Sequence, residues 1–405
     1  MSRFLLTNSS LNDTIEKLIG SEASPMKKKR QWIWQHPDYP TFRYDLHLFL
    51  PLITQIAQNT GQVQALIALL DQGVQNSIKI DLFTSDIVAT SVIEGEHLSR
   101  ESVRSSIRKK LDADQEADAD TSTYYTDTLA DLLMDACSNA TPLSRERLHQ
   151  WHVALLSHAP SVFKNIRLGK FREYDDMQIV SGSIGKEKIH YVGLPHKQID
   201  ADINALLSYI NHAKDPVYIK SAIAHLWFVS IHPYDDGNGR IARLISDYVV
   251  SQNFGIEYKY FSISAAIAKD RKSYYDKLET TQNLQDNPHL ECNSWITWYL
   301  ERCNDALLQT LGEIHKIINK TKFWDKIRHI PLNQRQLKVL NKLLQYNAGE
   351  FQGGLTSKKY VAMTKTSLAT AKRDMQELVQ HGCLRRIEGT KGRNVSYEIA
   401  YESLH

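Results

Sequence analysis

Apolar residues recur at helical spacing along most of the chain. From Leu46 to about Leu111 they return every three or four positions, with Gly and Asn as interruptions, which is typical of helices that pack one face on a core. The same spacing is found over 123–158 and 197–231, and again up to about Ile327. We therefore expect a mainly α-helical fold.

Two segments instead alternate in the manner of an extended chain. In WIWQHPDYPTFRYD, residues 32–45, aromatic side chains alternate with polar ones around two prolines, which favours a short hairpin or an extended segment with the aromatics turned inward. In MQIVSGSIGKEKIHYVGLP, residues 177–195, β-favouring runs flank the polar stretch SGSIGKEK. The second segment is therefore expected to form a β-hairpin.

The last part of the chain has its own pattern, which begins near Pro331. Two helical segments joined by a turn precede two short β-favouring runs around a glycine-rich tip, an order typical of a winged helix-turn-helix domain. Residues 331–405 contain 12 Lys and Arg against 6 Asp and Glu, a formal +6, so the rest of the chain is close to −3 (3 − 6). Five of its cations could meet DNA phosphates: Lys365, Lys372, Arg373, Lys391 and Arg393. Contact with DNA and contact with a protein are equal alternatives for this part.

Composition adds little to this picture but narrows the class of protein. With 42% hydrophobic and 23% charged residues, the 405-residue chain is an ordinary globular protein. The cysteines are Cys137, Cys292, Cys303 and Cys383, too far apart for a zinc site or a disulfide framework, so a reducing compartment is expected. No run of about 18 apolar residues is present. We expect a cytoplasmic protein without membrane contact.

The stretch HPYDDGNGR at residues 232–240 concentrates chemistry in nine positions. Pro233 disfavours helical geometry at His232, so the helix through HLWFVSI should end there and present the imidazole at a corner. Gly237, Asn238 and Gly239 can turn successive backbone N–H groups toward one point. The helix that follows would add the partial positive charge of its N-terminus, which favours an anion.

The charged residues beside this turn complete a set of parts for phosphate chemistry. Arg240 and Arg243 share a helix face, so they could hold a polyphosphate from one side. Asp236 could hold Mg²⁺ against the phosphates. A base, a metal ligand, an anion cradle and two cations indicate phosphoryl or nucleotidyl transfer. The alternative is an Asn-Gly turn between two helices, with a capping aspartate and solvent-facing arginines.

The stretch HPYDDGNGRIAR resembles the signature of the Fic family, His-Pro-Phe-x-Asp/Glu-Gly-Asn-Gly-Arg-x-x-Arg, with Tyr234 in place of phenylalanine. Tyr234 should still anchor the loop in the core. The resemblance implies a helical core that transfers AMP from ATP to a Ser, Thr or Tyr hydroxyl of a target protein. It implies His232 as the general base, a role that suits a neutral imidazole, and Asp236 as the Mg²⁺ ligand. The phosphates would be held by Gly237, Asn238, Gly239, Arg240 and Arg243.

The run TSVIEGE, residues 90–96, bears on regulation. Thr90 and Glu94 are four apart, so on a helix they share a face, and Gly95 is a natural stop. Taken alone, the run is a helix end with an exposed glutamate. Beside the Fic signature it resembles the inhibitory motif Ser/Thr-x-x-x-Glu-Gly/Asn, which implies that Glu94 pairs with Arg243 and keeps ATP from a productive pose. Removal of AMP with help from Glu94 stays open as a hypothesis.

Three more segments resemble parts of the family. The hairpin at 177–195 resembles the flap that aligns a target by strand addition, although an ordinary surface excursion is an equal alternative. Its docking residues would be Ile179, Val180, Ser181, Ile189 and Tyr191. DRKSYYDKLETTQ resembles the adenine pocket, with Tyr275 and Gln282 near the base, or is a plain amphipathic helix. GKFR, residues 169–172, also looks like family sequence.

These expectations divide the chain into three parts. Residues 1–120 would form an N-terminal helical region with the inhibitory motif, 121–328 a Fic-type core with a hairpin flap, and 329–405 a winged-helix domain. The favoured function is a protein adenylyltransferase that uses ATP and Mg²⁺ and is restrained by Glu94. The alternative is a DNA-binding regulator with an idle or secondary core. Self-modification and a homodimer stay open.

Overall fold

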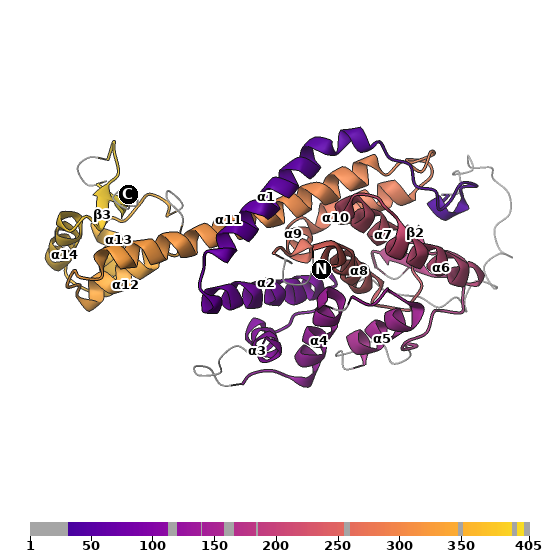
Figure 1. Cartoon of the computed structure of the whole chain (residues 1–405), viewed down its shortest axis with the longest axis horizontal. Helices are drawn as coiled ribbons and strands as arrows, with labels where there is room; N and C mark the ends of the chain where they lie inside the picture. Colours follow the sequence, from indigo (N-terminus) through magenta and orange to yellow (C-terminus); the bar gives the residue numbers. More distant parts are fainter. Residues whose placement is uncertain are drawn as a thin grey trace. The chain divides into compact units, whose positions relative to one another are not determined.

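The computed structural model describes residues 31–111, 120–138, 140–157, 166–183, 185–254, 260–346, 351–390 and 395–400. The chain divides into two compact units, Met1–Leu307 and Leu308–His405. Helices dominate both units (Figure 1), as the spacing of apolar residues predicts, and the described strands pair into two small antiparallel sheets. Lys391 and Arg393, expected at the tip of the C-terminal ribbon, lie outside the described residues.

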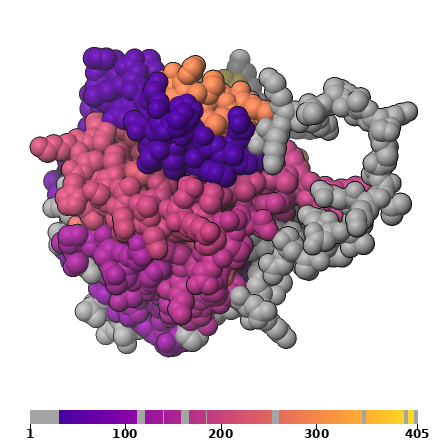
Figure 2. All heavy atoms as spheres, turned by 90° about the vertical axis from the view of Figure 1, so that its right-hand side faces the viewer, coloured from indigo at the N-terminus to yellow at the C-terminus, as the bar shows by residue number. Residues whose placement is uncertain are grey.

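The first unit opens with the aromatic segment, residues 32–45, for which the sequence predicts either a hairpin or an extended chain. It is not a hairpin, because its bridges join it to distant residues: Trp32 to Asn283 and Arg43 to Glu291. The backbone N–H of Asp45 donates to Asn293 at 2.9 Å, and in Figure 2 an indigo part of the chain lies beside an orange part. The segment contains the 3₁₀ helices η2 (Ile33–Gln35) and η3 (Leu46–Leu48).

Eleven described helices make up the body of the first unit. The N-terminal ones are α1 (Leu50–Ala68), α2 (Gln72–Ile93) and α3 (Arg100–Lys110). The others are α4 (Tyr124–Ser138), α5 (Arg145–Leu156), α6 (His196–His212), α7 (Val217–Ile231), α8 (Asn238–Phe254), α9 (Ile263–Lys269), α10 (Arg271–Gln282) and α11 (Asn293–Ile327), the last of which continues into the second unit.

Helix α7 lies in the core of the first unit. Its residues from Ser221 to Ile231 are all buried, as expected for a helix that is apolar on every side. It packs against α8, and α8 also contacts α2, α4, α5 and α9. The turn between α7 and α8 is therefore held by helices from across the first unit.

A β-hairpin is attached to this helical body, as predicted for residues 177–195. Its strands β1 (Gln178–Ser181) and β2 (Lys188–Val192) are antiparallel, with Ile179 opposite Tyr191 and an irregularity after Ile179. The indole N–H of Trp34 donates to the carbonyl of Val192 at 2.8 Å. The aromatic segment therefore covers the end of the second strand.

The second unit has a hydrophobic core of its own, which includes Leu340, Tyr360, Met375 and Leu384. Its elements are α12 (Gln334–Leu343), α13 (Ser357–Thr364), α14 (Leu368–Gln380), β3 (Leu384–Arg386) and β4 (Tyr397–Ile399). A tight turn joins α13 to α14, and in it Lys365 adopts φ +52°. The order of these elements agrees with the expected winged helix.

The four cysteines are buried thiols, which fits the expectation that no disulfide framework supports the fold. None of the helices that the structure describes combines the length and the apolar character that crossing a membrane requires. The expected cytoplasmic location stays a prediction.

Candidate functional site

The segment HPYDDGNGR forms the connection between α7 and α8. His232 ends α7 with φ +51° and ψ +59°, in the left-handed region, which a residue other than glycine rarely adopts and which concentrates at functional sites. Gly237 has φ +79°, and α8 begins at Asn238. The helix end at His232 and the turn through the glycines are therefore as predicted.

The imidazole of His232 is arranged to accept a proton. Its Nδ1 lies 3.2 Å from the carbonyl oxygen of Val229. Since a carbonyl only accepts, Nδ1 carries the hydrogen and Nε2 has the free lone pair. Burial lowers the pKa of His232 to about 4, with the charge of Arg172 acting in the same direction and the Val229 carbonyl and Glu94 opposing it. The side chain is thus a neutral base near pH 7.

The two adjacent carboxylates have different surroundings. Asp235 is buried and accepts from the backbone N–H of Arg167 at 3.0 Å, so it fixes the loop before the hairpin. The side chain of Asp236 is 40% exposed and accepts from the N–H of Gly237 at 2.6 Å. Of the two, Asp236 is the one that can reach a ligand in solvent.

Tyr234 anchors the loop in the hydrophobic core, as its place in the motif predicts. It is fully buried and stacks on His152, with ring centroids 4.0 Å apart. Its hydroxyl lies 3.0 Å from Nδ1 of His149, so the extra oxygen relative to phenylalanine has a partner. The side chain of Asn238 binds the backbone N–H and carbonyl of Tyr234 at 3.0 and 2.8 Å. Asn238 therefore stabilises the turn through its side chain, and its backbone N–H lies at the start of α8.

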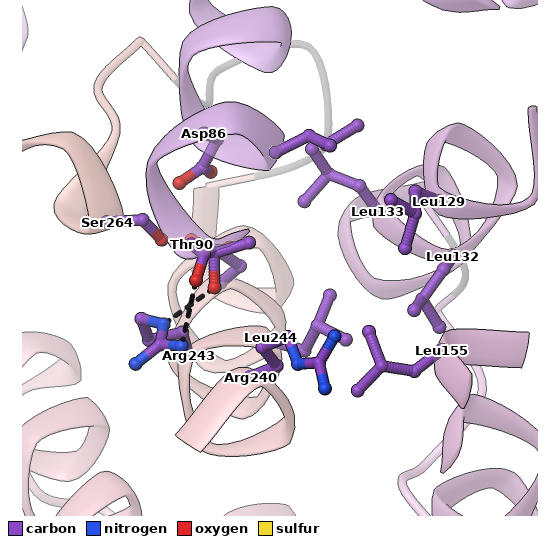
Figure 3. A pocket seen from close by; sticks show the side chains of 12 residues that line it. Asp86, Thr90, Leu129, Leu132, Leu133, Leu155, Arg240, Arg243, Leu244 and Ser264 are labelled. Atoms are coloured by element: carbon purple, nitrogen blue, oxygen red, sulfur yellow. Dashed lines mark hydrogen bonds between the residues drawn. The ribbon is translucent and has the colours of Figure 1, made fainter. Parts of the chain in front are cut away.

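Arg243 is almost completely buried and is bound by the end of α2. Its Nη2 donates to Glu94 Oε1 at 2.6 Å and its Nε to Thr90 Oγ1 at 2.6 Å. Figure 3 shows the bonds between Thr90 and Arg243 at one end of a pocket, with leucines from α4 and α5 at the other. Glu94 follows directly after α2, and Gly95 has φ +84°. The structure thus brings together Thr90, Glu94 and Arg243.

A second glutamate binds the other arginine of the segment. Arg240 Nη1 donates to Glu96 Oε2 at 3.2 Å, and Arg240 Nη2 lies 3.8 Å from Asp236 Oδ2. The same oxygen of Glu96 accepts from the hydroxyl of Tyr125 at 3.2 Å. The sequence gives no sign of this pair, because Glu96 lies outside the inhibitory motif.

The two arginines keep capacity for a further anion. Arg240 Nε and Arg243 Nη1 are buried and have no hydrogen-bond partner among the described residues, which is costly unless a ligand supplies one. A Cβ placed on Gly239 would overlap Glu94 Oε1, so the carboxylate of Glu94 lies directly over the first turn of α8. A helix N-terminus with adjacent guanidinium groups is suited to phosphate.

The Glu94–Arg243 pair is electrostatically tight. Burial raises the pKa of Glu94, but the charge and the hydrogen bond of Arg243 outweigh it, so the pKa lies below its ordinary value. Burial likewise lowers the pKa of Arg243, and Glu94 more than restores it. Both groups are therefore charged near pH 7, and each neutralises the other.

The two residues expected near adenine differ in their surroundings. Tyr275 lies under the guanidinium of Arg271, 5.5 Å from its ring centroid. Burial raises the pKa of Tyr275 to about 12, and the charge of Glu94 adds to the rise. Gln282 is buried, and its amide donates to the hydroxyl of Ser230 at 2.9 Å. The contact of either residue with a base stays a prediction.

The predicted docking residues of the hairpin divide into inner and outer ones. Val180 and Tyr191 are buried, and the Tyr191 hydroxyl donates to the carbonyl of Ser230 at 2.8 Å. Ile189 is 39% exposed, while Ile179 and Ser181 are half-buried. Lys188 and His190 of β2 both bind Glu279 of α10, at 3.0 and 2.6 Å. Docking of a target along the hairpin stays a prediction.

Residues far from the motif hold it in place, and the sequence did not identify their role. His152 donates through Nε2 to the carbonyl of Asp236 at 3.2 Å and accepts at Nδ1 from Gly169 at 3.0 Å, and burial lowers its pKa to about 4. Arg172 of the GKFR stretch binds the carbonyl of His232 at 2.8 Å. No spacing rule joins residues 60 or more positions apart, so the family-like appearance of GKFR was the only available signal.

Two segments of this chain match the models of known protein families. Residues 142–250 match the model of the Fic/DOC family, and residues 32–113 match that of a domain of unknown function, DUF4172. A Fic family protein from Desulfovibrio desulfuricans G20 is 15% identical, with 86% of this chain and 96% of that chain covered and a TM-score of 0.47.

Two other solved structures resemble the chain to a similar degree. A Fic domain containing signaling protein from Bacteroides thetaiotaomicron VPI-5482 is 16% identical, with 65% and 96% of the two chains covered and a TM-score of 0.48. Fic-1 from C. elegans is 15% identical, with coverage of 66% and 74% and a TM-score of 0.44. The match of the family model includes the whole segment between α7 and α8. Residues 142–250 of this chain therefore form a domain of the Fic/DOC family.

Proposed function

We propose that this chain is a protein adenylyltransferase, which transfers AMP from ATP to a hydroxyl of a target protein and is restrained by Glu94. Fic/DOC domains are typically transferases that move nucleotide or phosphate-containing groups to proteins. One observation carries the proposal for this chain. The carboxylate of Glu94 lies over the first turn of α8 and binds Arg243 at 2.6 Å, so the chain's own anion occupies a site suited to a phosphate.

The described residues support one course for the reaction. Nε2 of His232 takes the proton of the target hydroxyl, and the hydroxyl oxygen attacks the α-phosphorus of ATP. The new oxygen–phosphorus bond forms as the bond to the β-phosphate breaks, and pyrophosphate leaves. Arg240, Arg243 and the backbone N–H groups of Gly237 to Gly239 stabilise the negative charge on the phosphates.

Asp236 fits a magnesium ion that arrives with the nucleotide. It is the exposed carboxylate of the loop, and Mg²⁺ is usually held by one or two carboxylates together with substrate phosphates. Such an ion would neutralise charge on the phosphates. Elsewhere in the described part of the chain, no three His, Cys, Asp or Glu side chains gather as a metal site.

Restraint by Glu94 follows from the chemistry of its position. While Glu94 binds Arg243, this guanidinium is already neutralised, and a terminal phosphate would meet a like charge next to Gly239. Removal of the carboxylate leaves Arg243 with donors for the phosphate and removes the repulsion.

The test compares labelling of proteins with radioactive ATP and Mg²⁺. Glu94→Gly should raise self-labelling or labelling of lysate proteins by at least about tenfold, which corresponds to about 1.4 kcal/mol. Glu94→Gly combined with His232→Ala should abolish it. Glu101→Gly, at an exposed position of α3, serves as the matched control and should leave labelling at the level of the unmodified chain. Equal labelling with and without Glu94 would contradict restraint, and no labelling in any variant with ATP would contradict the transferase.

The second unit supports a further candidate function, binding of nucleic acid. On α14 the side chains of Asp374 and Met375 are buried, while Lys372, Arg373 and Gln376 are exposed. One face of the helix is therefore polar and carries two cations, of which Arg373 lies 4.0 Å from Glu377. A face of this kind fits the phosphates and base edges of a DNA groove. Lys372→Glu with Arg373→Glu should abolish the shift of a DNA duplex in a gel, and binding should weaken with salt. If the unmodified chain shifts no duplex, a protein contact becomes the better account of this face.

A further inference from the structure

Arg172 is a buried cation whose partners are carbonyl oxygens. The residue is 2% exposed. It donates from Nε to His232 at 2.8 Å, from Nη1 to Tyr174 at 2.5 Å, and from Nη2 to Ile231 at 3.3 Å. Nη2 also donates to the carbonyl of Leu194. In the described part of the chain no carboxylate lies within ion-pair distance of this guanidinium.

Three of these carbonyls, those of Ile231, His232 and Leu194, lie where α7 and the hairpin end. The last carbonyls of a helix have no partner within the helix and carry partial negative charge. The backbone N–H of Arg172 donates to the carbonyl of Pro233 at 2.9 Å. One residue therefore binds three successive carbonyls, those of Ile231, His232 and Pro233, on both sides of the left-handed residue.

These hydrogen bonds fix the backbone at His232, whose positive φ is unfavourable for a residue other than glycine. A residue other than glycine keeps positive φ only where its surroundings over-determine it. Gly193, just after β2, completes the support, since a Cβ there would lie 3.0 Å from Arg172 Nη2 and 3.3 Å from the Cβ of His232. The end of the hairpin, the guanidinium and the histidine are thus packed against one another.

We propose that Arg172 is a positioning residue, which holds His232 in the left-handed conformation that directs Nε2 to the reacting hydroxyl and joins this loop to the end of the hairpin at Leu194. The inference rests on the proposed function for the identity of the reaction. The positive charge of Arg172 also acts on His232, where it adds to burial in lowering the pKa. Geometry and charge therefore both favour a neutral, aligned base.

The experiment uses the full chain with Glu94→Gly and adds Arg172→Gln or Arg172→Lys. Arg172→Gln should lower kcat about 100-fold, as expected for a misplaced catalytic group, and change KM for ATP less than about twofold, because the phosphate-binding groups stay in place. The imidazole of His232, followed by NMR of histidine-labelled protein and assigned with His232→Ala, should titrate at a higher pH. Arg172→Lys keeps the positive charge but cannot reach all of the carbonyls that the guanidinium binds. The titration of His232 should therefore stay near that of the Glu94→Gly parent, while kcat falls.

Arg147 provides the matched control, because it is also a buried arginine that binds backbone carbonyls. It donates to the carbonyls of Thr141 and Asp135 at 2.6 and 2.7 Å, and unlike Arg172 it also pairs with a carboxylate, that of Asp135, at 2.9 Å. Arg147→Gln should lower the melting temperature and leave both the pH profile of kcat and the His232 titration unchanged.

Two results would overturn the inference. One is a kcat and a His232 titration in Arg172→Gln equal to those of the parent. The other is a loss of kcat no larger than in Arg147→Gln at the same loss of melting temperature. If the Glu94→Gly parent transfers no AMP, the proposed function fails, yet the titration still decides whether Arg172 governs His232. If Arg172→Gln does not fold, Arg172→Lys decides through its kcat.

Discussion

At the scale of single residues, the site depends on small differences between like groups. Asp235 and Asp236 are neighbours, yet one is buried against the loop before the hairpin and the other is open to solvent. His149 and His152 lie one turn apart on α5 and both bind the α7–α8 segment. The role of each residue is set by its burial and hydrogen bonding, which the residue type does not reveal.

The lowered pKa of His232 gives a prediction for the pH dependence of the reaction. The pKa is about 4 because burial disfavours the charged imidazole, so the base form prevails from about pH 5 upward. In the Glu94→Gly chain, initial rates of AMP transfer should be flat between about pH 6 and 8 and fall toward pH 4. An acid limb centred near pH 6.5, the ordinary value for histidine, would contradict this placement of the imidazole.

At the scale of elements, the end of α2 and the start of α8 meet through two ion pairs. Glu94 binds Arg243 and Glu96 binds Arg240, at 2.6 and 3.2 Å. The geometry of α2 places Thr90 and Glu94 on the face that the spacing of four predicts. Gly95, with φ +84°, turns the chain directly after α2, and Glu96 then reaches Arg240 of α8.

The pair of Glu96 and Arg240 predicts a second, weaker effect on ATP. Glu96→Gln removes the negative charge that neutralises Arg240, while Tyr125 keeps a polar partner. ATP should therefore bind a few-fold more tightly, by about 1 kcal/mol. The measurement is calorimetry with a non-hydrolysable ATP analogue. Glu101→Gln is the control and should leave the affinity unchanged. Affinity in Glu96→Gln equal to that of the unmodified chain would show that Glu96 does not compete with phosphate.

The sequence predicted the elements well and the contacts between them poorly. Helical spacing, the hairpin and the helix end before Pro233 are local patterns, and the structure confirms them. The Glu94–Arg243 contact spans 149 positions, and it was expected only because the motif resembles one in a known family. The contacts of Arg172 and His152 span 60 and 84 positions and depend on how α5, α7 and the hairpin pack, which no local pattern encodes.

At the scale of the whole molecule, the chain consists of two units with separate hydrophobic cores. Leu340 is fully buried in the second unit, and Ile245 of α8 is fully buried in the first. Because the two cores are separate, each unit can unfold in a step of its own.

Unfolding in denaturant should therefore show two transitions. Leu340→Ala should lower the midpoint of one transition, and Ile245→Ala that of the other, since each leaves a cavity that costs about 2–5 kcal/mol. In the Glu94→Gly chain an ATP analogue should raise only the transition that Ile245→Ala lowers. Fluorescence and circular dichroism during urea titration provide the measurement. A single transition shifted by both variants would contradict independent cores.

Mild acid should destabilise the first unit. Burial lowers the pKa of His152, His225 and His232 to about 4, 3 and 4, while the unfolded chain binds these protons from about pH 6.5. Between these values the unfolded state holds more protons, so stability falls as pH falls, by about 2 kcal/mol for each histidine at pH 5. Urea midpoints at pH 7 and pH 5 test this, and an unchanged midpoint for the first unit would contradict it.

The place of Glu94 over Gly239 has a quantitative consequence for the cell. The carboxylate and a nucleotide phosphate would exclude one another from the same volume. A stronger Glu94–Arg243 ion pair therefore requires a higher nucleotide concentration to displace it. Every 1.4 kcal/mol by which the Glu94–Arg243 contact is favoured over its open form raises the ATP concentration needed to half-fill the proposed site about tenfold.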